Sequence, residues 1–415
     1  MRVVVVGSGG REHALADALG RTCEVTVTPG NAGIPGSVPT DAVDLDADLF
    51  VIGPEVPLVD GLADRLRAQG KLVFGPGADG AQLEGSKVWM KQLLVDAGVP
   101  TARYGSFTDE QAALAFLDTM APPYVIKTDG LAAGKGVVVT ESLTEARNAV
   151  GDYLSGAAFG AAGEVLVIEE GLVGPEVSVF AICDGTRALT LSPAQDFKRI
   201  GDGDEGPNTG GMGAFTPVPD VDDELLADIT SRCIEPTLAE LRRRGIDYRG
   251  VLFAGLMLTA DGPKMLEYNV RFGDPECQVL IPRFADDLAA VLAEAAAGEL
   301  VTVPHVEDGA SVTVVCAAEG YPTSPRTGDV ISGIDEARSL EGVSVYCAGV
   351  ASDDEGRLVT AGGRVLNVCG RGATLTEARE RAYAGVDRIS YRGKTVRRDI
   401  AQRAASAQQA GGTPS

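Results

Sequence analysis

Three polar side chains alternate with apolar ones in the segment LEYNVRFGDPE (266–276). Residues two apart in a strand share a face, so Glu267, Asn269 and Arg271 are expected to point the same way. A carboxylate and an amide oxygen suit a hard cation such as Mg²⁺. An arginine beside them can hold a carboxylate or stabilise phosphoryl charge. The alternation predicts a metal site with an adjacent catalytic arginine; the alternative is an exposed strand face with a surface ion pair.

A glycine-rich loop with a lysine lies between two β-rich runs in YVIKTDGLAAGKGVVV (124–139). A P-loop has four residues between its glycines and a hydroxyl residue after its lysine. Here three residues separate Gly130 from Gly134, and Gly136 follows Lys135. The valines that follow favour a strand. The segment therefore predicts a β-hairpin whose tip contacts phosphate, with an ordinary exposed hairpin as the alternative.

Two more lysines and a pair of glutamates precede the strand at 266–276. Lys127 ends the first run of the hairpin, and Lys87 is near the start of a predicted helix. Either can contact a phosphate, although a single lysine is more often only solvated. An apolar run ends at Glu169 and Glu170, which suggests a hinge whose backbone meets the edge of an adenine.

The first glycine turn, GSGGRE (7–12), follows the apolar run VVVV. A dinucleotide fingerprint needs a third glycine where Glu12 stands, and no acidic residue clearly ends the next strand. An NAD(P)-dependent oxidoreductase is therefore disfavoured. The turn still leaves backbone N–H groups at a helix N-terminus, which predicts a phosphate site for a small substrate. A tight strand–helix turn without a ligand is the alternative.

The composition limits the kinds of partner. The chain has 415 residues and a formal net charge of −23, which argues against nucleic acid. Seven cysteines without C-x-x-C spacing indicate reduced thiols in a cytoplasm, and two histidines exclude a histidine-rich metal site. No apolar run is long enough to cross a bilayer, and the apolar start is too short for a signal peptide. We expect a cytoplasmic protein without a targeting segment or a membrane partner.

The order of predicted elements divides the chain. Strands and helices alternate over 1–100, which predicts a Rossmann-like parallel sheet. Short helices and β-runs over 101–304 predict a central α+β domain, with a smaller subdomain over about 120–190. A β-rich domain is expected over 305–402, followed by a disordered tail over 403–415. The expected fold class is α/β and α+β with several domains.

Several of these motifs together resemble a known fold and family. Lys87, VIKTDGLAAGKGV, IEEGL with GPEVS, and LEYN resemble the ATP-grasp fold, in which two α+β subdomains hold ATP. Longer motifs are similar to those of the phosphoribosylamine–glycine ligase family, also called glycinamide ribonucleotide synthetases. They are GSGGREHA (7–14), GPEVPL (53–58), AQDFKRIGDGDEGPNTGGMGAF (194–215), EYNVRFGDPE (267–276) and AGGRVLNV (361–368). They span about 400 residues in the family's order.

The resemblance implies an ATP-dependent ligation of glycine to 5-phosphoribosylamine in de novo purine (IMP) biosynthesis. The reaction passes through glycyl phosphate and gives glycinamide ribonucleotide, ADP and phosphate. Its cofactors are ATP and Mg²⁺ or Mn²⁺, its partners are small molecules, and a monomer or weak dimer is expected. The alternatives are another ATP-grasp carboxylate–amine ligase or a biotin-carboxylase-like enzyme. A nucleotide-binding module without catalysis is disfavoured because the charged residues above are all present.

The resemblance also assigns residues to roles. It implies ATP contacts at Lys87, Lys127, Gly134, Lys135, Gly136, Glu169, Glu170, Leu172 and Glu176, and catalytic roles for Arg271, Lys127 and Lys135. It implies substrate contacts at Gly9, Gly10, Asn31, Glu55, Asp196, Lys198 and Arg271, and metal ligands at Glu267 and Asn269. His13 is as consistent with packing as with substrate contact.

Two departures from the expected pattern are visible. Many ATP-grasp enzymes carry a second acidic metal ligand on the preceding strand, but VLFAGLML (251–258) contains no acid. A second tightly bound metal is therefore in doubt. Ala401 stands where the family pattern has glycine, far from the predicted chemistry.

Overall fold

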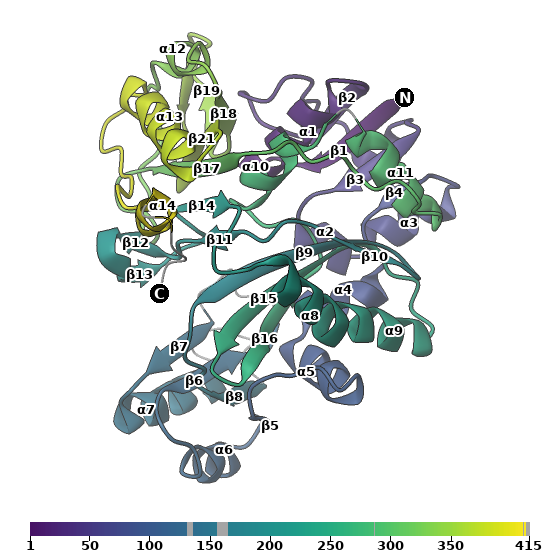
Figure 1. Ribbon diagram of the computed structural model, residues 1–415, viewed down its shortest axis with the longest axis vertical. Coiled ribbons are helices and arrows are strands. Elements are labelled where there is room, and N and C mark those ends of the chain that lie inside the picture. The colour runs from purple at the N-terminus through teal and green to yellow at the C-terminus, as the bar shows by residue number, and fades with distance from the viewer. Residues whose placement is uncertain (131–135, 156–164, 286, 410, 412–415) are drawn as a thin grey trace.

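The computed structural model of the chain describes residues 1–130, 136–155, 165–285, 287–409 and 411. Within this part the chain forms four sheets of four or five strands and two sheets of two strands. In Figure 1 the N-terminal sheet and the C-terminal sheet lie side by side at the top, and the central sheet and a smaller sheet lie below them. This arrangement confirms the predicted fold class.

The N-terminal sheet is parallel throughout, with the strand order β2-β1-β3-β4. Its inner strands are almost wholly apolar and buried, as expected for a parallel sheet covered on both faces. The strands are β1 (Arg2–Gly7), β2 (Glu24–Pro29), β3 (Leu49–Ile52) and β4 (Val73–Phe74), and the helices between and after them are α1 (Gly10–Leu19), η1 (Ala42–Asp44), α2 (Glu55–Val59), α3 (Leu62–Ala68) and α4 (Ala78–Gly85).

Helices from later in the chain also cover this sheet. The segments α10 (Cys277–Leu280), η5 (Ile281–Arg283) and α11 (Leu288–Ala297) share one hydrophobic core with β1 and α1. Figure 1 shows α11 against β4 and α10 beside α1. The sequence assigned these residues to the central domain. The same core includes Phe180 and Phe253 of the central sheet, so these helices pack between the two domains and the predicted boundary at residue 304 stays a prediction.

The small lower sheet is antiparallel, with the order β5-β8-β6-β7. Its elements are β5 (Tyr104–Phe107), α6 (Glu110–Leu117), β6 (Tyr124–Thr128), β7 (Val137–Thr140), α7 (Leu143–Leu154) and β8 (Leu166–Glu170). The pairing of β6 with β7 confirms the predicted hairpin strands. The subdomain begins at β5, not near residue 120, and ends before residue 176, because the next strand pairs elsewhere. Its apolar residues form a core separate from the other domains.

The central sheet is antiparallel, with the order β10-β9-β15-β16, and helical segments pack beside it. Its strands are β9 (Glu176–Asp184), β10 (Ala188–Thr190), β15 (Arg249–Thr259) and β16 (Gly262–Asn269). The helical segments are α5 (Lys87–Asp96), α8 (Asp223–Ile229), the π-helical turn η4 (Thr230–Ile234) and α9 (Glu235–Arg243).

The C-terminal sheet takes two of its five strands from the glycine-rich stretch of the central domain. Its order is β11-β14-β17-β21-β18. The strands are β11 (Gln195–Asp196), β14 (Gly213–Thr216), β17 (Ala310–Ala317), β18 (Val343–Cys347) and β21 (Arg364–Gly372); the remaining elements are β12 (Arg199–Gly201), η3 (Asp202–Asp204), β13 (Glu205–Asn208), α12 (Ile334–Arg338), β19 (Val350–Ser352), β20 (Leu358–Thr360) and α13 (Leu375–Arg388). The predicted boundary at residue 305 missed this exchange, because strands of 2 and 4 residues carry no clear period-two signal.

The predicted disordered tail begins too early. Residues Gln402–Gln409 form α14, whose Ala404 and Ala405 are buried in the core of the C-terminal domain. The side chain of Gln408 also accepts a hydrogen bond from the backbone of Leu375 at 2.9 Å. Two small apolar residues are enough to dock the helix, although its polar composition suggested a solvated tail.

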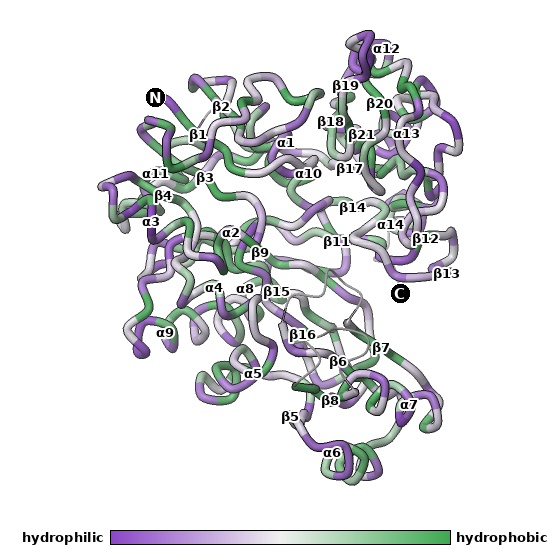
Figure 2. Tube along the Cα trace, turned by 180° about the vertical axis from the view of Figure 1, so that it is seen from behind, coloured by the Kyte–Doolittle hydropathy of each residue, from purple (hydrophilic) through white to green (hydrophobic). Residues whose placement is uncertain are grey.

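Apolar residues lie along the strands in Figure 2, and polar residues lie along many of the connecting turns. One core cluster joins parts of the N-terminal, central and C-terminal sheets, which fixes these three units against one another. Among the described helices, none combines the length and the apolar character that crossing a bilayer requires.

Candidate active site

The three side chains predicted to share a face lie at the end of β16. Asn269 ends this strand, and its side-chain oxygen accepts a hydrogen bond from Nη2 of Arg271 at 3.1 Å. Glu267 and Asn269 face the same side because they are two residues apart in one strand. The alternation therefore places a carboxylate, an amide oxygen and a guanidinium together.

Two glutamates of the N-terminal domain hold Arg271. Nε of Arg271 lies 3.2 Å from Oε2 of Glu55, and Nη2 lies 2.8 Å from Oε1 of Glu84. The other oxygen of Glu84 accepts the N–H of Val270 at 2.8 Å. Burial raises the pKa of Glu84. Burial alone would also raise the pKa of Glu55, but the charge of Arg271 outweighs the effect of burial there, and the pKa of Glu55 is lowered. The sequence analysis named Glu55 but missed Glu84.

Lys127 contacts a buried carboxylate. Its Nζ lies 3.1 Å from Glu169, and Nζ of Lys91 lies 3.1 Å from the same carboxylate. Burial opposes ionisation of Glu169, but the two lysines outweigh it and lower its pKa. Burial lowers the pKa of Lys91 to about 8. Lys91 also donates to Thr101 at 2.7 Å, which in turn donates to the backbone of Met265 on β16.

Lys87 begins α5 and faces the base of the hairpin. Its Nζ donates to the carbonyl oxygen of Gly130 at 2.9 Å, and burial lowers its pKa. Asp129 lies beside it and accepts hydrogen bonds from the hydroxyl of Ser86, at 3.1 Å to one oxygen, and from the N–H of Val88 at 3.2 Å. The end of β6 is therefore joined to the N-terminus of α5, where the helix dipole favours an anion.

The tip of the hairpin lies outside the described residues, and with it Gly134 and Lys135, which the sequence analysis assigned to phosphate. Gly136 is described, and its carbonyl oxygen accepts the N–H of Thr128 at 2.9 Å. This bond continues the hairpin ladder by one step beyond the paired residues of β7.

Lys198 lies among acidic groups in front of β16. It forms an ion pair with Glu176. Burial alone would lower the pKa of Lys198, but the negative charges of Asp196, Glu176 and Glu267 outweigh burial and raise it. Burial, with the charge of nearby Glu176, raises the pKa of Asp196. Burial and the charge of Asp196 raise the pKa of Glu276 to about 7. The sequence analysis did not single out Glu276 as a site residue.

The side chains of the predicted adenine hinge bind protein groups. Glu170 accepts the N–H of Arg103 at 3.0 Å, and its own N–H donates to the carbonyl of that residue at 3.0 Å. Gly171 donates its N–H to the carbonyl of Pro123 at 2.8 Å. Leu172 lies in the connection that leads to β9. The N–H groups of Glu170 and Gly171 are thus used within the protein, and the adenine contact expected at this hinge stays a prediction.

The first glycine turn is packed closely. The N–H of Gly9 donates to the carboxylate of Glu12 at 2.6 Å. A Cβ added at Gly10 would lie 2.1 Å from the side-chain nitrogen of Asn367, so a larger residue would have to displace Asn367 between α1 and the C-terminal sheet. Both amide atoms of Asn367 are buried without a hydrogen-bond partner among the described residues. The turn therefore also packs the N-terminal domain against the C-terminal domain.

Asn31 and His13 also join the N-terminal and C-terminal domains. The side-chain nitrogen of Asn31 donates to Ser8 at 2.8 Å and to the backbone of Ala348 at 3.0 Å. Nδ1 of His13 accepts the N–H of Cys347 at 2.8 Å. Burial lowers the pKa of His13 to about 4. The structure thus gives His13 a packing contact and gives Asn31 protein partners at the edge of the glycine turn.

The donor set at β16 fits a divalent cation. Glu267 and Asn269 offer the hard oxygens that Mg²⁺ prefers, and Glu176 and Asp196 add negative charge nearby. Within the described ranges, no group of three or more His, Cys, Asp or Glu side chains is arranged to hold a metal ion. Glu267 and Asn269 would supply two ligands, so phosphate oxygens and water would have to complete such a site.

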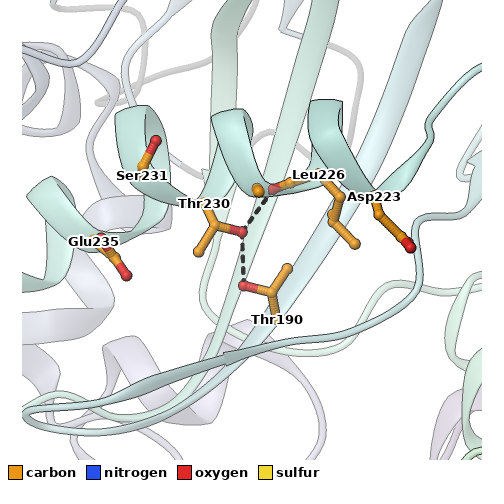
Figure 3. A pocket seen from close by; sticks show the side chains of 7 residues that line it. Thr190, Asp223, Leu226, Thr230, Ser231 and Glu235 are labelled. Atoms are coloured by element: carbon orange, nitrogen blue, oxygen red, sulfur yellow. Dashed lines mark hydrogen bonds between the residues drawn. The ribbon is translucent and has the colours of Figure 1, made fainter.

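A surface hollow between β10 and α8 lies apart from these residues. Figure 3 shows its lining side chains, Thr190, Asp223, Leu226, Thr230, Ser231 and Glu235. Thr230 donates to the backbone of Leu226 at 2.8 Å and lies 3.0 Å from the hydroxyl of Thr190. These hydroxyls bond to each other and to the helix, and the two carboxylates of the lining, Asp223 and Glu235, lie at opposite ends of the hollow in Figure 3.

The fold and this set of residues define an ATP-grasp enzyme. In fold the chain is similar to the biotin carboxylase domain of Hydrogenobacter thermophilus 2-oxoglutarate carboxylase, with a TM-score of 0.71 and 16% identity over 95% of this chain and 91% of that chain. Residues 1–84, 85–277 and 311–403 match the N, ATP-grasp (A) and C domains of phosphoribosylglycinamide synthetase. The chain belongs to the phosphoribosylamine–glycine ligase family, which confirms the predicted resemblance.

Individual relatives agree with this assignment. The phosphoribosylamine–glycine ligase of Mesorhizobium japonicum is 48% identical over 99% of this chain and 100% of its own length. The trifunctional purine biosynthetic protein adenosine-3 of Gallus gallus is 47% identical over 97% of this chain and 42% of its own length. The solved structure of a phosphoribosylamine–glycine ligase from Thermotoga maritima has a TM-score of 0.87 and 36% identity over 96% of this chain and 100% of that chain.

Proposed function

We propose that the chain ligates glycine to 5-phosphoribosylamine with ATP, forming glycinamide ribonucleotide, ADP and phosphate in purine biosynthesis. The observation that supports this most directly is the position of Arg271 beside Glu267 and Asn269, on a chain that matches the three domains of one ligase family. A carboxylate is a poor electrophile, and the reaction makes it a good one by phosphorylation.

The first step is phosphoryl transfer. A carboxylate oxygen of glycine attacks the γ-phosphorus, the bond to the bridging oxygen of ADP breaks, and glycyl phosphate forms. Such transfers depend mainly on positioning and charge stabilisation. Lys87 and Lys127 are the proposed cations for the α- and β-phosphates, and Arg271 is proposed to orient the glycine carboxylate and the moving phosphoryl group. Lys135 belongs to the same proposal as a γ-phosphate contact.

The second step forms the C–N bond. The amine of 5-phosphoribosylamine attacks the acyl carbon, phosphate leaves, and the nitrogen loses a proton. The N-terminal glycine turn with Gly9, Gly10, Asn31 and Glu55 is proposed to hold this substrate, with Asp196 and Lys198 as further contacts. In this proposal the substrate lies between residues of the N-terminal domain and of the glycine-rich stretch, so the acyl phosphate would form between surfaces that limit its contact with water.

The charge balance around Lys127 supports its role. Glu169 is shared by Lys127 and Lys91, so the carboxylate keeps a cationic partner when Lys127 turns toward a phosphate. We therefore propose that Glu169 acts through Lys127, and that the backbone from Glu170 to Leu172 meets the adenine. Glu176 is proposed to bind the ribose hydroxyls.

The proposed metal ligands are Glu267 and Asn269. A divalent cation there would offset the negative charge of the ATP phosphates, and we propose Mg²⁺ or Mn²⁺ in this role. The Hydrogenobacter biotin carboxylase domain, described in complex with ADP as its magnesium salt, shares the fold and supports a metal–nucleotide site. Asn269 also accepts a hydrogen bond from Arg271, which orients its oxygen.

The remaining parts of the proposal concern the molecule in the cell. We propose a cytoplasmic monomer or weak dimer that binds small molecules and not nucleic acid. The net charge of −23 and the seven free thiols support this. Light scattering over a range of protein concentrations tests the oligomeric state.

Release of phosphate from ATP tests the proposed reaction. The purified protein is given ATP and Mg²⁺, with glycine and 5-phosphoribosylamine added singly and together. We expect release to require both, and mass spectrometry to detect glycinamide ribonucleotide. Turnover with bicarbonate in place of glycine would instead indicate a biotin-carboxylase-like reaction. Release with neither substrate, or with another acid only, would contradict the proposed substrates.

An arginine variant tests the proposed site. Arg271→Ala is expected to lower kcat/KM by at least about 1,000-fold, because it removes the cation at the developing charge. Arg244→Ala is the matched control, since the side chain of Arg244 is similarly exposed, 20% against 16% for Arg271, and pairs with Glu240 and Asp96 outside the proposed site. Equal losses in both variants would show that Arg271 has no special role.

A further inference from the structure

We infer that Glu84 is a positioning residue for Arg271, an inference that rests on the proposed role of this arginine. Glu84 lies in the N-terminal domain, and Arg271 follows β16 in the central domain. One carboxylate oxygen of Glu84 contacts Nη2 of Arg271 at 2.8 Å, and the other accepts the N–H of Val270 at 2.8 Å. Glu84 thus binds both the guanidinium and the backbone that carries it.

The position of Glu84 in its own helix does not favour a negative charge. Glu84 is the penultimate residue of α4, and a negative charge in the last turn of a helix is disfavoured by the helix dipole. Burial also raises its pKa, which means that the environment disfavours its charged form. Its distant partners compensate: the side chain is only 9% exposed, and both oxygens are occupied.

The contacts of Arg271 leave one edge for a ligand. Its Nε donates to Glu55 at 3.2 Å, and its Nη2 donates to Glu84 and Asn269. Its Nη1 has one long hydrogen bond among the described residues, to the carbonyl of Phe272 at 3.4 Å. The two short Nη2 contacts fix the plane of the guanidinium, so that Nη1 remains able to meet a carboxylate or phosphoryl oxygen.

The two glutamates differ in a way that assigns them different roles. The side chain of Glu55 is 29% exposed and its contact is longer, whereas Glu84 is 9% exposed and its contact is shorter. A substrate that reaches Glu55 can release it from Arg271. Glu84 would then keep the arginine in place, because it is also bound to Val270.

The test combines Glu84→Gln with a change of its partner. Glu84→Gln keeps the size of the side chain but removes the charge. We expect kcat/KM for glycine to fall by about 100-fold, because displacing a catalytic group by about 1 Å can have an effect of that size. The KM for ATP is expected to stay within about twofold. In an Arg271→Lys background the same change should lower kcat/KM by less than about threefold.

Controls separate positioning from folding. Glu240→Gln removes another buried glutamate with two arginine partners, Arg243 and Arg244, and is expected to change stability but not kcat/KM. If Glu84→Gln does not fold, Glu84→Asp keeps the charge but shortens its reach, and the same cycle applies. An equal effect of the Glu84 change in both arginine backgrounds, or an unchanged kcat/KM, would overturn the inference.

The variant cycle and the substrate assay can fail independently of each other. The unmodified protein, assayed with glycine and 5-phosphoribosylamine, tests the reaction itself. If another acid proves to be the substrate, the variant cycle is measured with that acid. Non-additivity between Glu84 and Arg271 would then still support the positioning role, and additivity would overturn it.

Discussion

Glu169 shows at the scale of one residue how a buried charge depends on its partners. Its carboxylate lies between Lys91 and Lys127, and its side chain is 2% exposed. Glu169→Gln would leave two lysines without their shared anion. Removal of one partner from a buried ion pair destabilises a protein by about 3–5 kcal/mol. We expect a loss of this order in urea unfolding at pH 7.

An exposed pair in the same subdomain provides the control. Arg147 and Asp118 lie 2.6 Å apart with both side chains about half exposed. Asp118→Asn is expected to change the free energy of unfolding by less than about 1 kcal/mol, because water screens such pairs. Similar losses in both variants would show that the environment of Glu169 is not the cause.

Single residues also show what the sequence could and could not predict about the site. The alternation of Glu267, Asn269 and Arg271 predicted a shared face; β16 fixes Glu267 and Asn269 on one side, and Arg271, just beyond the strand, contacts Asn269. The sequence did not identify Lys91 or Glu84. Their partners lie far along the chain, and neither has a local motif that indicates the contact.

At the scale of elements, the hairpin is attached to α5 by Asp129. Asp129 accepts the N–H of Val88 in the first turn of α5 and lies next to the carbonyl that Lys87 contacts. Asp129→Ala removes a cap of this helix, which typically costs about 1 kcal/mol. We also expect the KM for ATP to rise severalfold, because Lys87 loses its fixed surroundings. Thermal unfolding and initial rates measure the two effects.

A second aspartate separates the two effects. Asp109 caps α6 and accepts the N–H of Ala112 at 2.8 Å, on an exposed helix of the small subdomain. Asp109→Ala is expected to lose a similar amount of stability with no change in the KM for ATP. A rise in KM in both variants would mean that general loosening of the subdomain, and not the link to α5, affects ATP.

The element scale also shows which predictions failed and why. The hairpin strands and the parallel sheet followed from β-branched runs and from alternation with helices. The strands β11 and β14 were missed because they have only 2 and 4 residues, and β14, which pairs with β11, has its other partner β17 about 100 residues further along the chain. Long-range pairing of this kind is decided by the packed sheet and not by local propensity.

At the scale of the whole molecule, the N-terminal and C-terminal domains meet where α1 contacts β18. His13 on α1 accepts the N–H of Cys347 at the end of β18 and lies edge-on to Tyr346, with 5.6 Å between ring centres. Asn31 binds the backbone of Ala348 just beyond. These contacts hold the proposed substrate turn against the C-terminal domain, so the site depends on this junction.

The junction predicts a pH dependence of stability. Burial, helped by the charge of Arg338, lowers the pKa of His13 from its usual 6.5 to about 4. Between these values the unfolded chain binds the proton more readily than the native protein, so stability rises with pH through this window and is lost as pH falls. The full effect is about 3 kcal/mol, from about 1.4 kcal/mol per pKa unit. The imidazole is neutral in the native protein because Nδ1 must accept the N–H of Cys347.

His13→Asn tests this prediction, because the asparagine oxygen can accept the same N–H but does not titrate. Urea unfolding of both proteins at pH 4.5 and pH 7 gives the difference between them at each pH. Carboxylates elsewhere, such as Glu276, titrate in both proteins and cancel in that difference. We expect the unmodified protein to lose about 2–3 kcal/mol more than the variant on acidification. Parallel losses would mean that the domains separate for another reason and that His13 is not the group that titrates.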